Sequence, residues 1–174
     1  MAKQTPTNAS DDKFLALYHA ALANAGDLVG EAEILFEAEK FARAYMLGFT
    51  ALEEISKSQL AADVFTGHIT EVEFQEYYRD HKKKIGRMLW ATKDAKWYLD
   101  EPEGDYVDVE HPKVANRKDA LYVSLKADQL ISPSDIIGRE DARGIIHTVN
   151  VALERIREVT DFWGHQIGTK GLVK

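Results

Sequence analysis

Apolar residues recur at three- and four-residue spacing along most of this chain, and that spacing predicts amphipathic α-helices. The longest such run covers residues 31–65, and further runs cover residues 11–29, 70–99 and 132–163. The main apolar side chains that share one face of the longest run are Leu35, Phe41, Tyr45, Phe49, Leu52 and Leu60. Because helices with one apolar face bury it against one another, we predict an all-α fold, a four-helix up-and-down bundle.

Glycines and capping residues indicate where these helices begin and end. Gly26 and Gly30 are expected to end the first helix, and Gly67 is expected to end the second. Thr70 begins a Thr-x-x-Glu capping box at the start of the third helix. The fourth helix is expected to open at residues 132–135, where a serine is followed by a proline and, at the third position, an aspartate.

The region between the third and fourth helices differs from the rest of the chain. Residues 100–118 are rich in Asp, Glu, Gly and Pro and are expected to form a long irregular excursion. Residues 120–123 follow as an extended segment or a single turn. With residues 1–10 and 168–174 as flexible tails, we predict a single helical domain over residues 11–167.

The amino-acid composition excludes some classes of functional site and argues against others. The 174 residues include no cysteine, which excludes disulfides, thiolate metal sites and cysteine nucleophiles. The net charge of −7 argues against non-specific binding to nucleic acid or anionic lipid. No apolar run approaches the roughly 20 residues of a membrane span, so we expect no membrane association and a cytoplasmic location. The six histidines are scattered and phosphate-cradling motifs do not occur, so neither a metal nor a cofactor is expected.

Glu53 is expected on the buried face of the second helix, because it follows Phe49 by four residues. Carboxylates are rarely buried without a partner, and Lys57 lies four residues later in the favourable order. We therefore predict a Glu53–Lys57 pair. Two interpretations remain open: a structural ion pair along the helix, or one side of a functional site.

A basic run on the third helix offers a second set of candidates. His81 lies on the apolar face of that helix, Lys84 is three residues later, and Arg87 extends the positive charge. The simpler interpretation is a core histidine beside a solvated basic face. The functional interpretation is a surface that binds the phosphate groups of RNA.

Arg117 and Tyr122 form the third set, at the end of the excursion. In one interpretation, the chain brings Arg117 back over Glu53 and His81. In the other, Arg117 is solvated while the apolar residues around Tyr122, Leu121 and Val123, plug the bundle.

Several ordered segments together resemble the AbiV family of abortive-infection proteins, a branch of the HEPN superfamily of helical bundles. The segments with this resemblance are Ala23-Asn24-Ala25, Ala42-Arg43-Ala44, Ala51-Leu52-Glu53-Glu54-Ile55-Ser56-Lys57, His81-Lys82-Lys83-Lys84, and Arg117 through Ala120-Leu121-Tyr122-Val123. The resemblance covers roughly residues 20–159. It implies a bacterial or archaeal cytosolic protein that acts in anti-phage defence, and related HEPN proteins are commonly dimeric RNases that halt translation and growth.

One departure from the HEPN pattern concerns the catalytic signature. HEPN RNases carry an arginine followed, after four to six residues, by a histidine on the same helix. No arginine of this chain has that spacing: Arg143 and His147 are separated by three residues. An RNase site would therefore have to be assembled differently. The catalytic candidates are Glu53, Lys57, His81 and Arg117, and the substrate-binding candidates are Lys84, Arg87 and Tyr122.

Two classes of function follow from these residues. In a metal-independent RNase, His81 would act as acid or base, Glu53 would orient it, and the cations would hold phosphate. In a non-catalytic interaction module, the same residues would fix the helix register, and the partner would be a phage-encoded protein or part of the translation machinery. Expected partners are thus RNA, a phage-encoded activator or inhibitor, and a second copy of the chain. The homodimer is suggested by a surplus of aromatic residues, namely Trp90, Trp97, Tyr98 and Trp163.

Overall fold

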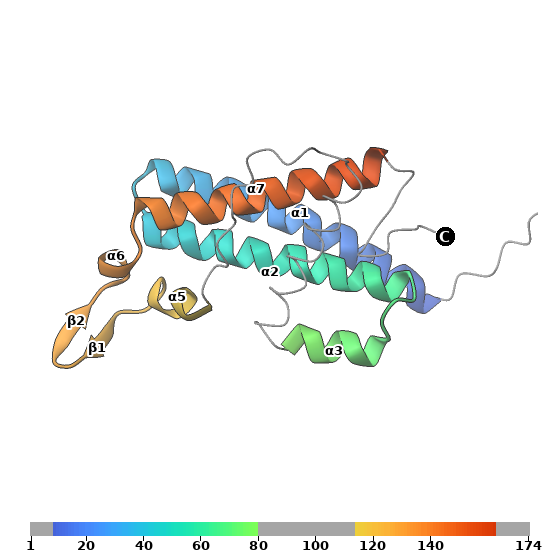
Figure 1. Cartoon of the computed structure of the whole chain (residues 1–174), viewed down its shortest axis with the longest axis horizontal. Helices are drawn as coiled ribbons and strands as arrows, with labels where there is room; N and C mark the ends of the chain where they lie inside the picture. Colours follow the sequence, from blue (N-terminus) through green and yellow to red (C-terminus); the bar gives the residue numbers. More distant parts are fainter. Residues whose placement is uncertain (1–8, 80–113, 163–174) are drawn as a thin grey trace, which may run out of the picture.

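The computed structural model describes residues 9–79 and 114–162 (Figure 1). Within these two ranges, the side chains described are those of residues 13–79 and 117–157. The predicted continuation of the third helix to residue 99 therefore lies outside the described residues, as does the predicted tail over residues 168–174. Of the predicted tail over residues 1–10, residues 9 and 10 are described and belong to the first helix.

Three long helices form the body of the molecule and lie side by side, as Figure 1 shows. They are α1 (Ala9–Glu37), α2 (Phe41–Phe65) and α7 (Arg139–Phe162). A shorter helix, α3 (Glu71–Arg79), packs along α2. The four predicted helices correspond to these elements, so the all-α fold is confirmed.

Smaller elements connect the body to α7. They are α5 (Val114–Asp119), an antiparallel hairpin of β1 (Ser124–Lys126) and β2 (Gln129–Ile131), and the single-turn helix α6 (Pro133–Ile136). The end of the predicted irregular excursion is thus helical, and the prediction of an irregular loop is wrong there. After α5 the chain makes the predicted turn.

The core forms two clusters along the body. In the first, α1, α2 and α7 enclose fully buried side chains such as Phe49, Ile55 and Val149. In the second, the first turns of α1 meet α3 and the last turns of α2, and the rings of Phe14 and Phe74 pack edge to face with centroids 5.2 Å apart. Both clusters depend on α2, because each includes residues from it.

The turn between α1 and α2 is not where the glycines predict it. Helix α1 continues through Gly26 and Gly30 and ends at Glu37, so the predicted end near residue 29 is wrong. Glu39 takes the left-handed conformation with φ of 59°, and its N–H donates to the Phe36 carbonyl at 3.0 Å. The Lys40 N–H donates to the Leu35 carbonyl at 2.8 Å, which completes a Schellman motif.

The end of α2 follows the sequence prediction. Gly67 has φ of 72°, its N–H donates to the Val64 carbonyl, and the His68 N–H donates to the Asp63 carbonyl at 2.7 Å. The same Schellman geometry therefore ends α1 and α2, with a glutamate in one left-handed position and a glycine in the other.

The capping box of α3 is also confirmed. The Thr70 N–H donates to Glu73 Oε2 at 2.7 Å, and the Glu73 N–H donates to Thr70 Oγ1 at 3.2 Å. The backbone hydrogen bond and then the hydroxyl hydrogen bond from Thr70 lower the pKa of Glu73 below its ordinary value. The stabilisation by Glu73 is therefore complete at neutral pH and is lost as the pH falls through that lowered pKa.

The predicted fourth helix is two helices. Between α6 and α7 in the chain, the backbone of Ile137 is extended, with φ of −104° and ψ of 110°. The Ile137 side chain is buried in the core. Helix α7 then starts independently, since the Gly138 N–H donates to Asp141 Oδ2 at 2.9 Å. The predicted cap at Ser132 is present for α6, where the Ser132 N–H donates to Asp135 Oδ2 at 2.7 Å.

The left-handed Glu39 can be tested by comparing two substitutions. Both Glu39→Gly and Glu39→Ala remove the exposed ion pair with Arg139, but only Glu39→Gly removes the Cβ that the left-handed backbone disfavours. We expect Glu39→Gly to be about 1 kcal/mol more stable than Glu39→Ala in chemical denaturation. Equal stabilities would contradict the left-handed assignment.

The contact between α2 and α7 can be tested at Gly48. A Cβ added there would lie 2.8 Å from Ile145 Cγ2, so Gly48→Ala should lower the free energy of unfolding by about 1–3 kcal/mol. The matched control is Gly30→Ala on α1, where a Cβ meets nothing within 4 Å. That substitution should raise the free energy of unfolding by up to about 1 kcal/mol. In thermal melts, the melting temperature should therefore fall for Gly48→Ala and rise for Gly30→Ala.

Candidate functional site

The candidate site lies on the middle of α2, between the two short helices that pack along it. Figure 1 shows α5 beside the first half of α2 and α3 beside the second half. The site residues Glu53 and Lys57 fall on this stretch of α2. One side chain from each short helix reaches them: Arg117 from α5 and Tyr78 from α3.

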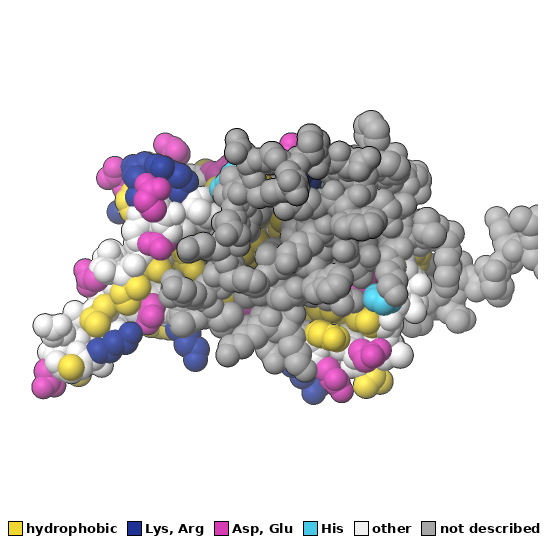
Figure 2. All heavy atoms as spheres, in the orientation of Figure 1, with side chains coloured by type: hydrophobic (Ala, Val, Ile, Leu, Met, Phe, Trp, Pro, Cys, Tyr) yellow, Lys and Arg dark blue, Asp and Glu magenta, His cyan; other side chains and the backbone are white. Residues whose placement is uncertain are grey.

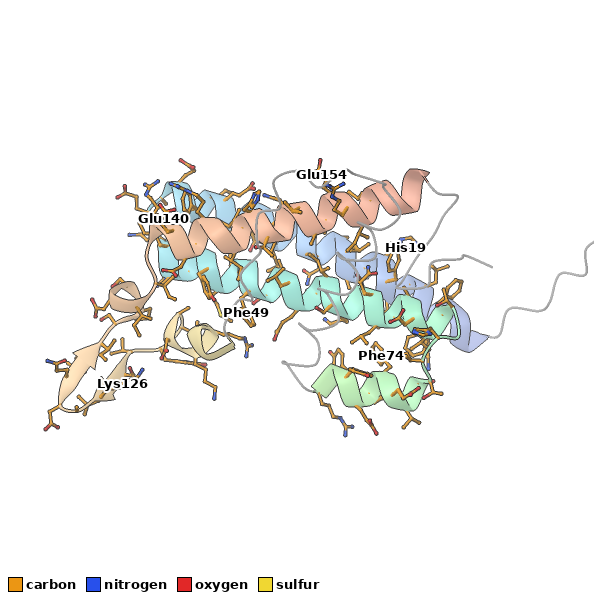
Figure 3. The ribbon with its side chains drawn as sticks, in the orientation of Figure 1. His19, Phe49, Phe74, Lys126, Glu140 and Glu154 are labelled. Atoms are coloured by element: carbon orange, nitrogen blue, oxygen red, sulfur yellow. The ribbon has the colours of Figure 1, made fainter. Side chains whose placement is uncertain are left out.

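Arg117 is placed over Glu53, as one interpretation of the sequence predicted. Its Nη2 atom is 4.0 Å from Glu53 Oε2, and the two side chains are 30% and 10% exposed. The guanidinium carbon is also 6.0 Å from the ring centre of Phe49, one helical turn before Glu53. Figure 3 labels Phe49 on α2. The arginine is therefore held by a carboxylate and an aromatic face, with 30% of its side-chain surface open to solvent.

Residues of α5 and its following turn explain how an arginine far along the chain reaches α2. The buried Ala120 belongs to the main core cluster and fixes the end of α5. The Leu121 and Tyr122 N–H groups both donate to the Lys118 carbonyl at 3.1 Å, which closes the turn. The end of α5 is thus anchored on the core, and this places Arg117 beside Glu53 of α2.

Lys57 has a different partner from the one predicted. Its ammonium group forms an ion pair with Glu54, three residues earlier, rather than with Glu53. On a helix, positions three and four residues away are both within reach, and the Glu53 carboxylate is turned toward Arg117. The Lys57 ammonium group also lies 5.8 Å from the ring centre of Tyr78. Lys57 is therefore a second cation on the stretch of α2 that Arg117 contacts.

Several other polar residues of α2 are buried beside this stretch. Ser56, Ser58, Gln59 and Asp63 have almost no exposed surface. The Ser58 hydroxyl donates to the Ile55 carbonyl at 2.7 Å. Among the described residues, the Ser56 hydroxyl and the Arg117 Nε–H are buried without a hydrogen-bond partner. Arg117 therefore keeps an unused donor next to its ion pair.

The other predicted site residues fall in two groups. His81, Lys84 and Arg87 lie outside the described residues, so their approach to Glu53 stays a prediction. Tyr122 is well exposed on the turn after α5, and its contact with substrate also stays a prediction. Its neighbours Leu121 and Val123 are exposed as well, so the alternative in which they plug the bundle is wrong.

Sequence reasoning missed three residues that the structure brings to the site. Phe49 was expected only on the apolar face of the second helix, and neither Glu54 nor Tyr78 was among the candidate site residues. The spacing of Glu54 and Lys57 along α2 was visible in the sequence. The contacts of Phe49 with Arg117 of α5 and of Tyr78 with Lys57 of α2 depend on tertiary packing. No periodicity along one helix could indicate them.

Two structural findings concern metals and membranes. In residues 9–79 and 114–162, no three histidine or carboxylate side chains gather as a metal site would require. Of the helices in that described part, none has the length and apolar character needed to cross a bilayer.

The described elements, three long helices with α3 and α5 packed on α2, define an all-α helical bundle. The family model described as AbiV, within the HEPN group, matches residues 13–154. The chain belongs to the AbiV family, which associates it with abortive infection, a defence against phage. No curated protein and no solved structure matches the chain.

The Glu53–Arg117 pair can be measured by a double-mutant cycle with Glu53→Gln and Arg117→Met. Because both groups are largely shielded from water, we expect a coupling energy of about 1 kcal/mol in the free energy of unfolding. The control is the exposed Glu140–Arg143 pair on α7, whose atoms are closer, at 3.1 Å. Its coupling should be smaller, near zero to about 0.5 kcal/mol, and a larger value than for Glu53–Arg117 would contradict the prediction.

Proposed function

We propose that this chain arrests growth or translation in phage-infected cells as a metal-independent RNase of HEPN type. The observation that carries the proposal is the placement of Arg117 on Glu53, from elements far apart in sequence, in a position that stays partly open to solvent. Membership of the AbiV family supports the defence role. The paired ionisable groups support a site that acts on a charged substrate in the cytoplasm.

The proposed chemistry uses groups of this chain alone. A base removes the proton of the ribose 2′-hydroxyl, that oxygen attacks the adjacent phosphorus, and an acid protonates the leaving 5′-oxygen. We assign one of these two roles, base or acid, to His81 and its orientation to Glu53. Arg117 and Lys57, with Lys84 and Arg87, stabilise the negative charge that develops on the phosphorus oxygens.

The geometry of Arg117 suits phosphate binding. Its guanidinium is fixed on one side by Glu53 and Phe49, while 30% of the side-chain surface stays open to solvent. A planar guanidinium that is already oriented can offer two parallel donors to one phosphate at little further entropic cost. The ion pair therefore orients the arginine without using all its donors.

A second candidate function is a non-catalytic interaction module. The burial of polar residues on α2 favours this function: Ser56, Ser58 and Asp63 are fully buried, and Glu53 is nearly so. Such buried polar residues can fix the register of packed helices. In this alternative, growth arrest follows from binding a phage-encoded activator or inhibitor protein, or part of the translation machinery.

The test is controlled expression in a bacterial host, with growth and total RNA measured together. We expect discrete RNA fragments from the unchanged chain, also when the purified protein is assayed in EDTA. Arg117→Met and His81→Ala should reduce cleavage about 100-fold, because each removes a group that stabilises or protonates the transition state. Arg143→Met, at an exposed arginine of α7, is the matched control and should cleave normally.

The two functions give different outcomes in that experiment. Intact RNA alongside arrested growth would overturn the RNase proposal and support the interaction module. If folded Arg117→Met and His81→Ala proteins both cleave RNA at the unchanged rate, the site assignment is wrong.

A further inference from the structure

The turn that follows α5 exposes an aromatic side chain next to the candidate site. Tyr122 is 64% exposed, and its neighbours in the chain, Leu121 and Val123, are 48% and 61% exposed. Runs of exposed apolar residues are avoided on protein surfaces unless they serve a function. Figure 2 shows apolar and basic side chains beside one another on the part of the molecule that carries the hairpin.

The backbone fixes the position of Tyr122 relative to Arg117. Ala120 is anchored in the core, and the Tyr122 N–H donates to the Lys118 carbonyl at 3.1 Å. A hydrogen bond from residue i to residue i−4 is the α-helical pattern, so Tyr122 lies one turn beyond Lys118. Arg117, the residue before Lys118, contacts Glu53. The exposed ring is therefore close to the arginine of the candidate site.

The charge of this segment is opposite in sign to that of the whole chain. Residues 114–126, from the start of α5 to the end of β1, include three basic side chains and one acidic side chain, a charge of +2 in a chain of net charge −7. The acidic side chain, Asp119, lies 3.5 Å from Lys126. Lys118 is exposed and lies on the same side as Tyr122, because the two are four residues apart. One surface therefore presents an aromatic ring and positive charge together.

The combination of ring and positive charge suits an unpaired nucleotide. A nucleobase stacks on an aromatic side chain, and its phosphate is attracted by neighbouring cations. In a duplex the bases are stacked on one another inside the helix, so they cannot cover a protein side chain. An apolar segment of a partner protein would cover Leu121 and Val123 but would leave the positive charge uncompensated.

We propose that the turn after α5 is a nucleobase-binding subsite, in which Tyr122 stacks on a base, and that the site takes RNA in its single-stranded form. This inference rests on the proposed RNase function and names the class of RNA on which it acts. Arg117 holds a phosphate beside the stacked base, and Lys118 adds attraction for the next stretch of backbone. Because every base has a flat face, stacking selects unpaired RNA rather than a particular sequence.

The test is fluorescence anisotropy of the full chain with a 2′-O-methyl RNA oligonucleotide, which lacks the hydroxyl that the proposed cleavage requires. The strand is measured alone and annealed to its complement. We expect the single strand to bind at least about tenfold more tightly than the duplex. Tyr122→Leu should weaken single-strand binding at least about fivefold, because leucine keeps an apolar surface but has no ring. Tyr122→Phe keeps the ring and should bind within about twofold of the unchanged chain.

The matched control is Leu125→Ala. Leu125 is 67% exposed, close to the 64% of Tyr122, but it is aliphatic and lies on β1. This substitution should leave single-strand binding unchanged. A loss equal to that of Tyr122→Leu would indicate a general apolar contact, of the kind that a protein partner makes, and would overturn the proposal.

Cleavage of unmodified RNA separates the subsite from the proposed function. Tyr122→Leu should raise the KM for single-stranded RNA far more than it changes kcat, because the ring contacts substrate and transition state alike. The subsite is overturned if the unchanged chain binds duplex as tightly as single strand, or if Tyr122→Leu binds like the unchanged chain. Cleavage in either of those cases leaves the RNase function standing. Single-strand binding through Tyr122 without any cleavage would overturn the RNase function alone.

Discussion

The packing of α2 on several neighbours at once is the constraint on which the rest of the structure depends. Helices α1 and α7 lie along it, and α3, α5 and α6 contact it from further directions. At Gly48 the backbone of α2 comes so close to Ile145 of α7 that no Cβ fits without a shift. A helix enclosed to this degree cannot leave its polar residues in water. They find partners within α2, as Ser58 does at the Ile55 carbonyl, or on a neighbouring element, as Glu53 does at Arg117.

Glu53 and Arg117 show the consequence of that enclosure. The carboxylate is too shielded to be stabilised by solvent alone, and the arginine supplied by α5 lies at 4.0 Å. In the same stretch, Lys57 is paired within its own helix and reaches the ring of Tyr78. The result is a short length of α2 with two oriented cations, one on each side, which is a suitable arrangement for a phosphate-containing substrate. The same arrangement would also stabilise the packing of α5 and α3 on α2, so only activity measurements separate the two roles.

Local sequence signals were reliable where the residue type was the physical cause of the conformation. Gly67 ends α2 because a left-handed residue is needed there, and Thr70 with Glu73 starts α3 through two hydrogen bonds. The signals failed where packing overrode them. Gly26 and Gly30 remain helical inside α1, and Glu39 accepts the left-handed position that usually selects glycine. The hairpin was missed because Ala127-Asp128 is not a typical sequence for its turn, so no local signal marked it.

The sequence by itself determined the helical class of the fold, the position of the carboxylate Glu53 on a buried face, and membership of the AbiV family. Helical periodicity records which face is buried, because each residue's burial follows from its angle around its own helix. Only the tertiary structure decided that Glu53 pairs with Arg117 and Lys57 with Glu54. It also decided that the apolar hairpin faces solvent. Those outcomes depend on the relative placement of separate elements, which no periodicity within one element contains.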